Sequence, residues 1–441
     1  MSEFAENIES SVAYFKLIRL DNVRSFKIKD EVFFSNSFEK PVQWTVILGN
    51  NNTGKTTILK CIADLYLRTE KMPVELLKKY NLEEQLDNFF FINSSEKITE
   101  LINNQSGGYF VEFCVNKEFK TKINSRHFTE SWGIKEINSK IISTVGYPHI
   151  RQVFLQGYST QRKISESSLS EQENTETLQS FFSNNFELIN VEEWLLQINY
   201  ASKNDDSSKA DRQRAKDIEK KVKEVITGDI LPDIKDFRFR STSDFKNYIE
   251  FQTDYGWVRL KDLGYGYQAT LAWVMDLAKR MFDRYPTSAN PLAEPAVVLV
   301  DEIDLHLHPE WQRKIISYLS NIFKNTQFIV TAHSPLIIQS AENVNLVMLE
   351  KDGDHINIRQ QFGSFKGWTV DEILDELMGM NDKTMSDTYL ELMKDFDNAL
   401  DEDNYEKAQK SYEGLDKILH PSSSQRKILR IQMSSLAPVE A

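Results

Sequence analysis

The sequence predicts an α/β protein with a mixed central sheet, a short helical insertion and a C-terminal segment that is helical throughout. Residues 44–49 (WTVILG) form a short apolar run, and a glycine-bounded loop separates it from the helical spacing of residues 55–67. Residues 296–300 (AVVLV) are a second apolar run of strand length, and two acids follow it. After Gly363 only helical patterns remain, so we expect no strand there.

The bulk composition indicates a globular protein but leaves its partner open. The chain has 441 residues, 40% of them hydrophobic and 27% charged, which is enough for two or three domains. Its start is acidic rather than signal-like, and no apolar run approaches the ~20 residues that cross a bilayer, so we expect no membrane contact. Cys61 and Cys114 are expected to be reduced thiols in a cytoplasmic protein. The net charge of -13 disfavours a surface that is basic throughout, although a local basic stripe would still bind nucleic acid.

Periodicity and turn signals predict the other elements. Alternating residues in 14–34 indicate two strands with a turn near residues 21–22. Further strands are expected at 109–115, 151–158, 237–242, 248–260, 327–334 and 344–353, and the last of these is expected to end the main sheet. Helices are expected at 190–203, after 263–268 and at 309–323.

Two polar stretches and the tail complete the secondary structure. Residues 163–183 are rich in Ser, Glu, Asn and Gln, which predicts a solvated loop. The run 204–226 predicts a solvated helix face, with contact to nucleic acid or a partner as the alternative. In the tail we expect a helical hairpin with its turn at 401–404. Its apolar faces are Leu392, Phe396 and Leu400 on one helix and Ala408, Tyr412, Leu415 and Leu419 on the other.

Residues 49–57 (GNNNTGKTT) fit the phosphate-loop pattern G-x-x-x-x-G-K-[ST]. Such a loop points its backbone N–H groups at a polyphosphate, and its glycines allow the backbone angles that this requires. Lys55 is expected to reach the terminal phosphates and Thr56 to ligate magnesium, and the helix that begins there adds its positive end. A glycine-rich surface turn is the alternative, which the flanking strand and helix disfavour. The predicted nucleotide-binding residues of the loop are Asn50, Asn51, Asn52, Thr53, Gly54, Lys55, Thr56 and Thr57.

Two acids and a histidine are candidates for hydrolysis. Asp301 follows an apolar strand, from which an acid can hold magnesium beside a phosphate loop, and Glu302 is the candidate general base. His333 closes the next strand and is placed to polarise the γ-phosphate; a structural histidine at a strand end is the alternative. His306 and His308 alternate after the acids, so a metal-dependent nuclease site is a second interpretation of this stretch. Two histidines without further ligands of fixed spacing disfavour it.

Residues 263–268 (LGYGYQ) stand just before a predicted helix. A loop at a helix start offers N–H groups and a positive dipole end to an anion. Because the protomer already has a phosphate loop, this second anion site indicates a dimer in which it faces the nucleotide of the opposite protomer. The residues concerned are Gly264, Tyr265, Gly266, Tyr267 and Gln268.

Together these motifs resemble the ABC-type P-loop ATPases of the SMC-like and OLD-like branch, over about residues 15–360. The resemblance rests on NVRSF (22–26), the phosphate loop, LGYGYQ, DEIDLHLHPEWQ and TAHSP. It implies two heads that sandwich two ATP molecules with Mg2+. It also implies Gln156 as a magnesium ligand, Arg24 as a nucleotide contact and Asp304 as the acid of the loop that crosses to the other protomer (the D-loop). Gly264 stands where the family has a serine, which implies slow hydrolysis.

The motifs divide the chain into four predicted parts. Residues 1–160 and 236–362 form the two halves of the ATPase head, and residues 161–235 form a helical insertion between them. Residues 363–441 form a helical domain for assembly or partner binding.

The resemblance narrows to a compact, defence-type branch. The stretch from Lys55 to Gly264 is about twice as long as in a transporter subunit and far too short for the coiled-coil arms of chromosome-organising heads. The tail is similar to that of the PtuA-like ATPases of Septu and retron defence systems. This implies a homodimeric or larger ATP-binding sensor and scaffold that regulates a separate HNH nuclease (PtuB-like), with DNA or a retron reverse transcriptase and its msDNA as further partners. An OLD-like ATPase-nuclease acting alone and a DNA repair SMC-like ATPase are the alternatives.

Overall fold

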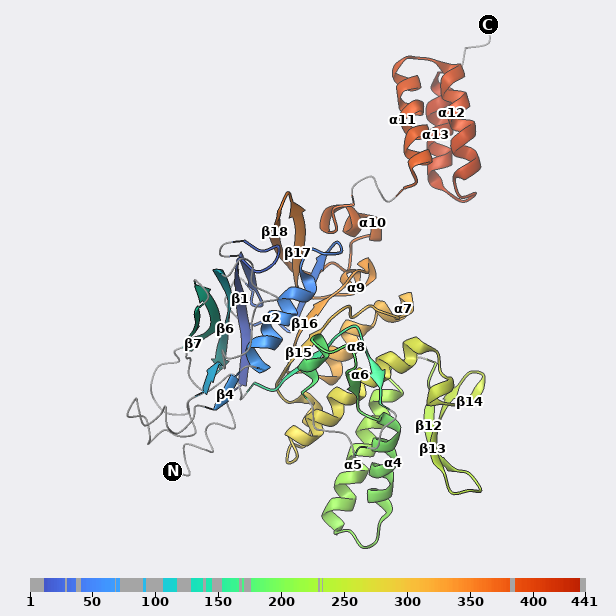
Figure 1. Ribbon diagram of the computed structural model, residues 1–441. Helices are drawn as coiled ribbons and strands as arrows, with labels where there is room; N and C mark the ends of the chain where they lie inside the picture. The colour runs from blue at the N-terminus through green and yellow to red at the C-terminus, as the bar shows by residue number, and fades with distance from the viewer. Residues whose placement is uncertain are drawn as a thin grey trace, which may run out of the picture. The chain divides into compact units, whose positions relative to one another are not determined.

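The structure is a computed structural model that describes residues 12–27, 30–36, 41–67, 69–71, 90–92, 106–116, 128–137, 140–144, 153–165, 169, 176–228, 231, 233–380 and 385–436. The chain divides into two compact units, Met1–Trp368 and Thr369–Ala441. Helices and strands carry the labels of Figure 1. None of the helices within the described ranges is both long and apolar enough to span a bilayer.

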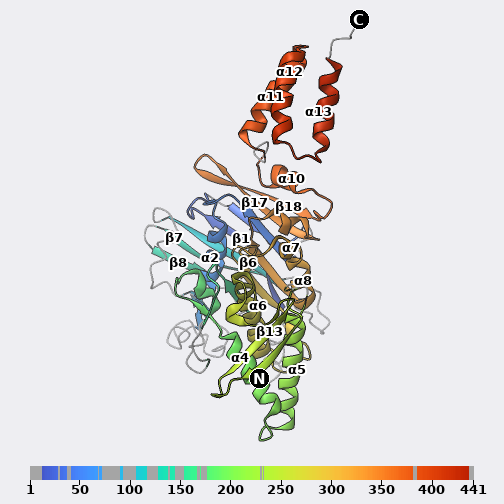
Figure 2. The same ribbon diagram turned by 90° about the vertical axis from the view of Figure 1, so that its right-hand side faces the viewer.

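The first unit is built on a six-stranded sheet in the order β18-β17-β3-β16-β15-β9. Figure 1 labels its strands β15, β16, β17 and β18, and Figure 2 shows β17 and β18 after a quarter turn. Five of the six strands run parallel and β18 pairs antiparallel with β17, so the predicted mixed sheet is confirmed. The strands are Trp44–Gly49 (β3), Leu155–Tyr158 (β9), Ala296–Val300 (β15), Thr326–Thr331 (β16), Val344–Asp352 (β17) and His355–Gly363 (β18).

The prediction that residues 344–353 end this sheet is wrong, because β18 adds one more strand at the edge. A tight turn joins it to β17, and Gly353 adopts a φ of 60° in that turn. Within β18 only Ile356 is buried, since an edge strand is largely exposed to solvent. The strand therefore lacks the apolar pattern of its neighbours, and the Asp-Gly turn was the available signal.

Both faces of the central sheet are covered, which explains why its inner strands are continuous apolar runs. Successive side chains point to opposite faces of a sheet. Ile47 and Ile329 belong to the core that the sheet shares with helix α2. On the other face Trp44 and Phe328 stack with 4.3 Å between ring centroids, and the Trp44 indole donates a hydrogen bond to Ser320 of α8 at 2.7 Å.

The helices of the first unit agree with most of the predicted ranges. The helix predicted over 309–323 is wrong as a single element, because a turn at Arg313 and Lys314 divides it into two. The helices are Lys55–Leu67 (α2), Val191–Lys203 (α4), Lys209–Ile226 (α5), Tyr265–Arg284 (α6), Pro309–Gln312 (α7), Ile315–Ile322 (α8) and Pro335–Gln339 (α9), with 3-10 turns at Thr177–Phe181 (η3), Leu260–Asp262 (η4) and Pro291–Ala293 (η5).

A second, antiparallel sheet packs on the far side of α2, in the order β2-β1-β6-β7-β8. The register of β1 on β6 shifts after Phe15, and Gln327 of β16 fills the irregularity. Its amide oxygen accepts from the Phe15 N–H at 2.8 Å, and its amide nitrogen donates to the Phe15 carbonyl at 2.9 Å. These bonds join the two sheets. The strands are Val12–Asp21 (β1), Asp30–Phe33 (β2), Ser106–Asn116 (β6), Phe128–Ile137 (β7) and Lys140–Thr144 (β8).

The described residues of the unit also form three smaller sheets. They are Thr69–Lys71 (β4) with Phe90–Ile92 (β5), Lys163–Ile164 (β10) with Glu187–Leu188 (β11), and the three strands Asp236–Ser241 (β12), Asn247–Thr253 (β13) and Gly256–Arg259 (β14). On α2, Cys61 is a free buried thiol whose pKa burial raises well above its usual value. The side chain of Cys114 lies outside the described residues.

The predicted solvated loop at 163–183 is wrong at its C-terminal end, where Thr177–Phe181 forms a buried 3-10 turn over β9. Gly157 allows this close approach. A Cβ added there would lie 2.6 Å from a ring carbon of Phe181 and 2.7 Å from a methyl carbon of Leu178. The polar neighbours in the sequence concealed these two apolar anchors. By contrast, α5 is the largely solvated helix that its polar run predicts, with four buried residues.

The second unit is helical throughout its described part, as predicted. Its helices are Val370–Glu372 (α10), Asp387–Asp401 (α11), Tyr405–Ile418 (α12) and Ser424–Ser435 (α13), with a π-helical turn at Ile373–Leu377 (η6). The predicted hairpin is α11 and α12, and α13 packs against it as a third helix that the prediction lacked. The buried core of the bundle is Phe396, Ala399, Ala408, Leu415 and Leu429.

We expect Gly157→Ala to destabilise the first unit by about 1–3 kcal/mol, because the new methyl group overlaps buried atoms of η3 that cannot move outward freely. Gly363→Ala is the matched control, since nothing lies within 4 Å of a Cβ there, and it should change stability by less than about 0.5 kcal/mol. Urea denaturation measures both. Equal stability of the two variants would contradict the packing of η3 on β9.

Candidate functional site

The predicted phosphate loop and acids meet at one edge of the central sheet. The loop follows the carboxyl end of β3, the acids follow that of β15, and β16 lies between the two strands. Carboxyl ends of parallel strands share one edge of a sheet, which is where α/β proteins bind ligands. The strand order therefore brings together residues that are far apart in the sequence.

Close packing fixes the phosphate loop at both of its glycines. A Cβ on Gly49 would lie 2.5 Å from Thr53 Oγ1, and Gly54 has a φ of +96°. A Cβ on Gly54 would lie 2.6 Å from the ring of Phe26, in the turn between β1 and β2. Asn50, Asn51 and Asn52 are exposed along the loop, whereas Thr53, Lys55 and Thr57 are buried.

The Lys55 ammonium lies inside the loop. Its Nζ donates to the carbonyl oxygens of Gly49 at 2.6 Å and Asn50 at 3.0 Å. Burial lowers the pKa of Lys55, and the nearby carboxylates of Asp301, Glu302 and Asp304 oppose that shift. The ammonium group is thus held at the N-terminus of α2, where the loop and the positive end of the helix dipole favour a polyphosphate.

Asp301 links the loop to the two strand ends. Its carboxylate accepts from Thr56 Oγ1 at 2.8 Å and from Thr331 Oγ1 at 2.7 Å, and the residue is only 4% exposed. A hydroxyl and a carboxylate are hard oxygen ligands of the kind Mg2+ prefers beside a phosphate. The side chains of Thr56 and Asp301 therefore fit the predicted metal-binding role, which stays a prediction.

Glu302 and His333 lie side by side, about one third exposed each, with 3.7 Å between Glu302 Oε1 and His333 Nε2. Glu302 has a φ of 50°, a left-handed conformation that is uncommon without glycine. Its N–H donates to Thr331 Oγ1 at 2.7 Å. The backbone thus presents the Glu302 carboxylate next to the imidazole and near Lys55 of the phosphate loop. The catalytic roles of Glu302 and His333 stay predictions.

Asp304 connects the acidic loop, residues 301–304, to His333. Its Oδ2 accepts from the His333 backbone N–H at 3.0 Å, and its Oδ1 is buried without a hydrogen-bond partner in the described structure. An unpartnered buried carboxylate oxygen is costly. The predicted D-loop acid is therefore placed to fix His333 and to accept one more donor.

The signature segment 264–268 differs in detail from the prediction. Gly264 is the N-cap of α6, so the next four residues form the first helical turn rather than a loop before the helix. A Cβ on Gly266 would lie 2.3 Å from the His306 carbonyl oxygen, and the Tyr265 ring meets the His306 ring at 4.7 Å. The signature segment and the D-loop of the same protomer are in direct contact.

The two remaining signature side chains are engaged within the protomer. Gln268 Nε2 donates to the Leu263 carbonyl at 2.7 Å. The Tyr267 ring packs edge-on against Trp311 at 4.3 Å, and its hydroxyl donates to Asp233. Tyr265 is left 59% exposed at the start of the helix. The part of the segment that faces solvent is thus the turn at Gly264 and Tyr265.

Gln156, a predicted magnesium ligand, and Arg24, a predicted nucleotide contact, lie outside the phosphate loop and the acidic loop. Gln156 lies on β9, and its amide oxygen accepts from Thr177 Oγ1 of η3 at 2.8 Å. Arg24 is exposed, with a φ of 50°, in the turn whose Phe26 packs on Gly54. The turn of Arg24 thus packs on the loop, whereas β15 and β16 lie between β9 and the strand that carries the loop. The predicted contacts of Gln156 with magnesium and of Arg24 with nucleotide stay predictions.

His306 and His308, which suggested a nuclease site, have structural contacts. His306 adopts a φ of 63° and carries the carbonyl that abuts Gly266. His308 caps α7, its Nδ1 accepting from the Glu310 N–H at 3.4 Å. Across the residues that the structure describes, no group of three or more His, Cys, Asp or Glu side chains is arranged to hold a metal ion.

Sequence reasoning missed Arg162, which is 4% exposed and donates to the carbonyls of both Asp301 and Glu302. Burial lowers its pKa to about 10, and the charges of Asp301, Asp304 and Glu302 oppose that shift. It follows β9 in the polar string STQRK, where nothing in the periodicity distinguishes a buried arginine from a solvated one. Strand order alone reveals it, since β9 and β15 are neighbours.

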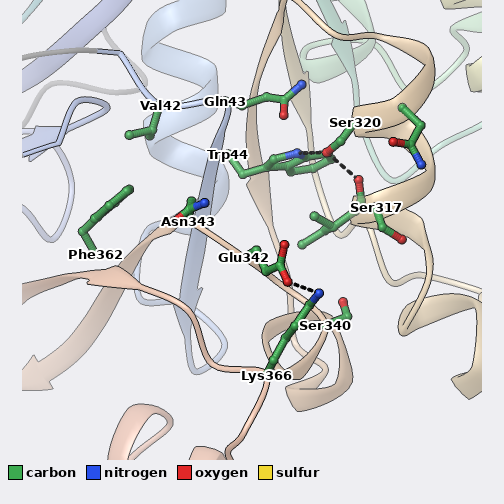
Figure 3. A pocket seen from close by; sticks show the side chains of 12 residues that line it. Val42, Gln43, Trp44, Ser317, Ser320, Ser340, Glu342, Asn343, Phe362 and Lys366 are labelled. Carbon is green, nitrogen blue, oxygen red and sulfur yellow. Dashed lines mark hydrogen bonds and ion pairs between the residues drawn. The ribbon is translucent and has the colours of Figure 1, made fainter.

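A cavity of about 410 Å³ lies at the opposite, amino end of β3 (Figure 3). Trp44, Ser320, Glu342 and Lys366 are among its lining residues, and Lys366 pairs with Glu342 across it. None of the twelve lining residues is a predicted site residue. This cavity is therefore separate from the candidate site at the phosphate loop.

A phosphate loop at the end of a parallel strand, with an Asp-Glu pair beside it on a mixed sheet, defines a P-loop ATPase of the ABC type. Residues 44–339 match the family described as "AAA domain, putative AbiEii toxin, Type IV TA system", and the chain belongs to that family. The matched residues contain the phosphate loop, the signature segment, both acids and His333.

Among curated proteins the chain is similar to Septu proteins and to a retron ATPase. It is 36% identical to Septu protein PtuA of Bacillus thuringiensis over 46% of this chain and 52% of that protein. It is 28% identical to PtuA of Bacillus mycoides over 85% of this chain and 46% of that protein. The Retron Ec83 probable ATPase of Escherichia coli is 35% identical over 32% of this chain and 26% of its own length. The chain thus spans about half, or less, of the length of these relatives.

Among solved structures, two SMC heads overlap with the chain. One is the head bound to the C-winged helix domain of ScpA, with 15% identity, coverage of 79% and 98%, and a TM-score of 0.44. The other is the SMC head domain from Thermotoga maritima, with 16% identity, the same coverage and a TM-score of 0.41. At TM-scores this low, the overlaps add nothing to the fold that the strand order defines.

We expect Gly264→Ser to leave the stability of the protein nearly unchanged and Gly266→Ala to lower it. The nearest atom to a Cβ on Gly264 is 3.7 Å away, and serine is a favourable N-cap, so stability should change by less than about 0.5 kcal/mol. At Gly266 the methyl group would overlap a backbone carbonyl, which costs about 1–3 kcal/mol or displaces the D-loop. Chemical denaturation compares the pair, and equal losses would contradict the contact between helix and D-loop.

Proposed function

We propose that this chain is the ATP-hydrolysing sensor and scaffold subunit of a bacterial anti-phage defence complex, and that it regulates a separate nuclease. One observation supports the chemistry most directly: Lys55, the Thr56–Asp301 pair and the Glu302–His333 pair converge on one sheet edge. Similarity to Septu and retron ATPases supports the defence role.

In the proposed reaction the phosphate loop and α2 bind the ATP phosphates through backbone N–H groups, and Lys55 neutralises the terminal phosphates. Thr56 and Asp301 would hold Mg2+, which supplies charge neutralisation of the phosphates when bound. Glu302 orients the attacking water and accepts its proton. His333, 3.7 Å from Glu302, stabilises the γ-phosphate charge. Asp304 holds His333 through its backbone N–H.

We further propose that two heads pair around ATP, each presenting its signature segment to the nucleotide of the other. The exposed turn at Gly264 and Tyr265, next to the D-loop, supports this arrangement. Because Gly264 lacks the hydroxyl that the resemblance implies at this position, it would contact the nucleotide through its backbone alone. Hydrolysis should therefore be slow, which suits a sensor that holds ATP for long periods.

The partner we propose is an HNH nuclease of the PtuB type, recruited by the head and the helical unit 369–441. The described part of that unit contains helices alone, which supports a docking role rather than a second active site. DNA, or a retron reverse transcriptase with its msDNA, would be the further partner. The OLD-like nuclease and the DNA repair ATPase have no specific observation in their favour.

Lys55→Ala should weaken ATP binding about 10- to 100-fold, because charged hydrogen bonds of this kind contribute about 1.5–3 kcal/mol. Lys60→Ala is the matched control. Lys60 lies on the same helix but is placed over the Phe182 ring at 5.8 Å, and its substitution should leave affinity within about threefold. Titration with a fluorescent ATP analogue measures both. Affinity that survives in Lys55→Ala would show that the loop is misassigned.

Glu302→Gln should lower ATP turnover about 10²- to 10⁴-fold through loss of the general base, while ATP stays bound and head-to-head dimers accumulate. Glu310→Gln, an exposed acid at the start of α7, is the control. Phosphate release and light scattering during size-exclusion chromatography measure turnover and mass, and plasmid nicking with Mg2+ is assayed alongside. Undiminished turnover would refute the assignment of Glu302. Nicking by the pure chain that is insensitive to Glu302 would favour the OLD-like alternative.

A further inference from the structure

Arg162 supports the backbone of the acidic loop, residues 301–304, from the interior of the protein. Its Nη2 donates to the carbonyl oxygens of Asp301 at 2.5 Å and Glu302 at 2.8 Å, and its Nε donates to the Ser159 carbonyl at 3.2 Å. Three backbone carbonyls from two neighbouring segments thus meet one buried guanidinium. Such a set satisfies most of the donors of an arginine that water does not reach.

The conformation of Glu302 explains why this support matters. Its φ of 50° is a left-handed angle at a residue that is not glycine, and such angles persist only where surrounding contacts enforce them. Arg162 holds the carbonyls on both sides of that residue's Cα, and Thr331 Oγ1 accepts from its N–H at 2.7 Å. The two contacts leave the Glu302 backbone little freedom, so the direction of its carboxylate is set from inside the protein.

Arg162 is also a buried cation next to the acidic loop. Lys55 lies in the phosphate loop, where a bound polyphosphate would claim its charge, whereas Arg162 is buried behind the acids. Its guanidinium carbon also lies 5.9 Å from the centroid of the Trp273 ring in α6, the helix that begins with the signature segment. Arg162 therefore touches the acidic loop, the end of β9 and the signature helix at once.

We propose that Arg162 is a positioning residue for ATP hydrolysis, which acts by holding Glu302 in its left-handed conformation and so aims the carboxylate of the proposed general base. The proposal rests on the proposed function, because it needs Glu302 to be the base. It assigns no contact between Arg162 and the nucleotide. Its consequence is a separation of effects: loss of Arg162 should affect turnover and leave ATP affinity nearly intact.

The test compares Arg162→Gln and Arg162→Lys in the full-length chain. We expect Arg162→Gln to lower kcat about 10- to 100-fold, as small misplacements of a catalytic group do, with affinity for a fluorescent ATP analogue within about threefold. Arg162→Lys keeps the charge and one donor head, so it should recover part of kcat. Arg280→Lys is the matched control. Arg280 pairs with Asp276 at 2.7 Å and its side chain is 19% exposed, so its kcat should stay within about threefold.

A double variant separates positioning from general structural support. If Arg162 acts through Glu302, then adding Arg162→Gln to Glu302→Gln should not lower residual turnover further. Additive losses, a parallel fall in ATP affinity, or an unchanged kcat in Arg162→Gln would overturn the proposal. If Arg162→Gln does not fold, Arg162→Lys decides, and unfolding of both would also overturn it, since the role would then belong to the fold as a whole. Absence of ATP hydrolysis in the unsubstituted chain, or an unaffected Glu302→Gln variant, would instead refute the proposed function.

Discussion

The buried carboxylate of Asp301 is the point on which the candidate site depends. It lies at the end of β15 and accepts from hydroxyls at the start of α2 and at the end of β16. A carboxylate that is 4% exposed is tolerable only when its oxygens are hydrogen-bonded, so the strand ends and the helix must be in register for the site to form. The same hydroxyl of Thr331 then holds the N–H of Glu302. One threonine thus orients both acids.

The charges around the Asp301 carboxylate explain which ligands the candidate site favours. Asp301, Glu302 and Asp304 lie near two cations, Lys55 and Arg162. Burial disfavours both cations, as their lowered pKa values indicate, and the acids retain them in their charged form. The acids outnumber the cations, an imbalance that favours a divalent cation and a polyphosphate arriving together.

The sequence predicted the parts of the site that have a local signature. The phosphate loop needs two glycines and a lysine at fixed spacing, and the acids follow a strand whose burial on both faces makes it continuously apolar. The helices of the tail were also predictable, because apolar residues repeat at helical spacing in each of them. Phe396 of α11 and Leu415 of α12 belong to these repeats and are buried in the bundle.

The parts that escaped prediction depend on contacts between distant segments. Arg162 is surrounded by polar residues in the sequence, and only the pairing of β9 with β15 buries it. η3 escaped because the Ser, Glu, Asn and Gln residues around it predict a solvated loop, and only its contact with β9 buries Leu178 and Phe181. β18 escaped because edge strands need little apolar surface. In each case the missing information was the identity of the neighbour, which local periodicity does not contain.

The contact between Gly266 and the His306 carbonyl has a genetic consequence. If heads pair as proposed, the signature segment serves the partner's nucleotide, while the adjoining D-loop controls the acids of its own protomer. A defect at this contact would then impair both nucleotides of a dimer that contains one altered and one normal copy. In a cell that makes both copies, the altered allele would behave as dominant, because only dimers of two normal chains would keep an intact site.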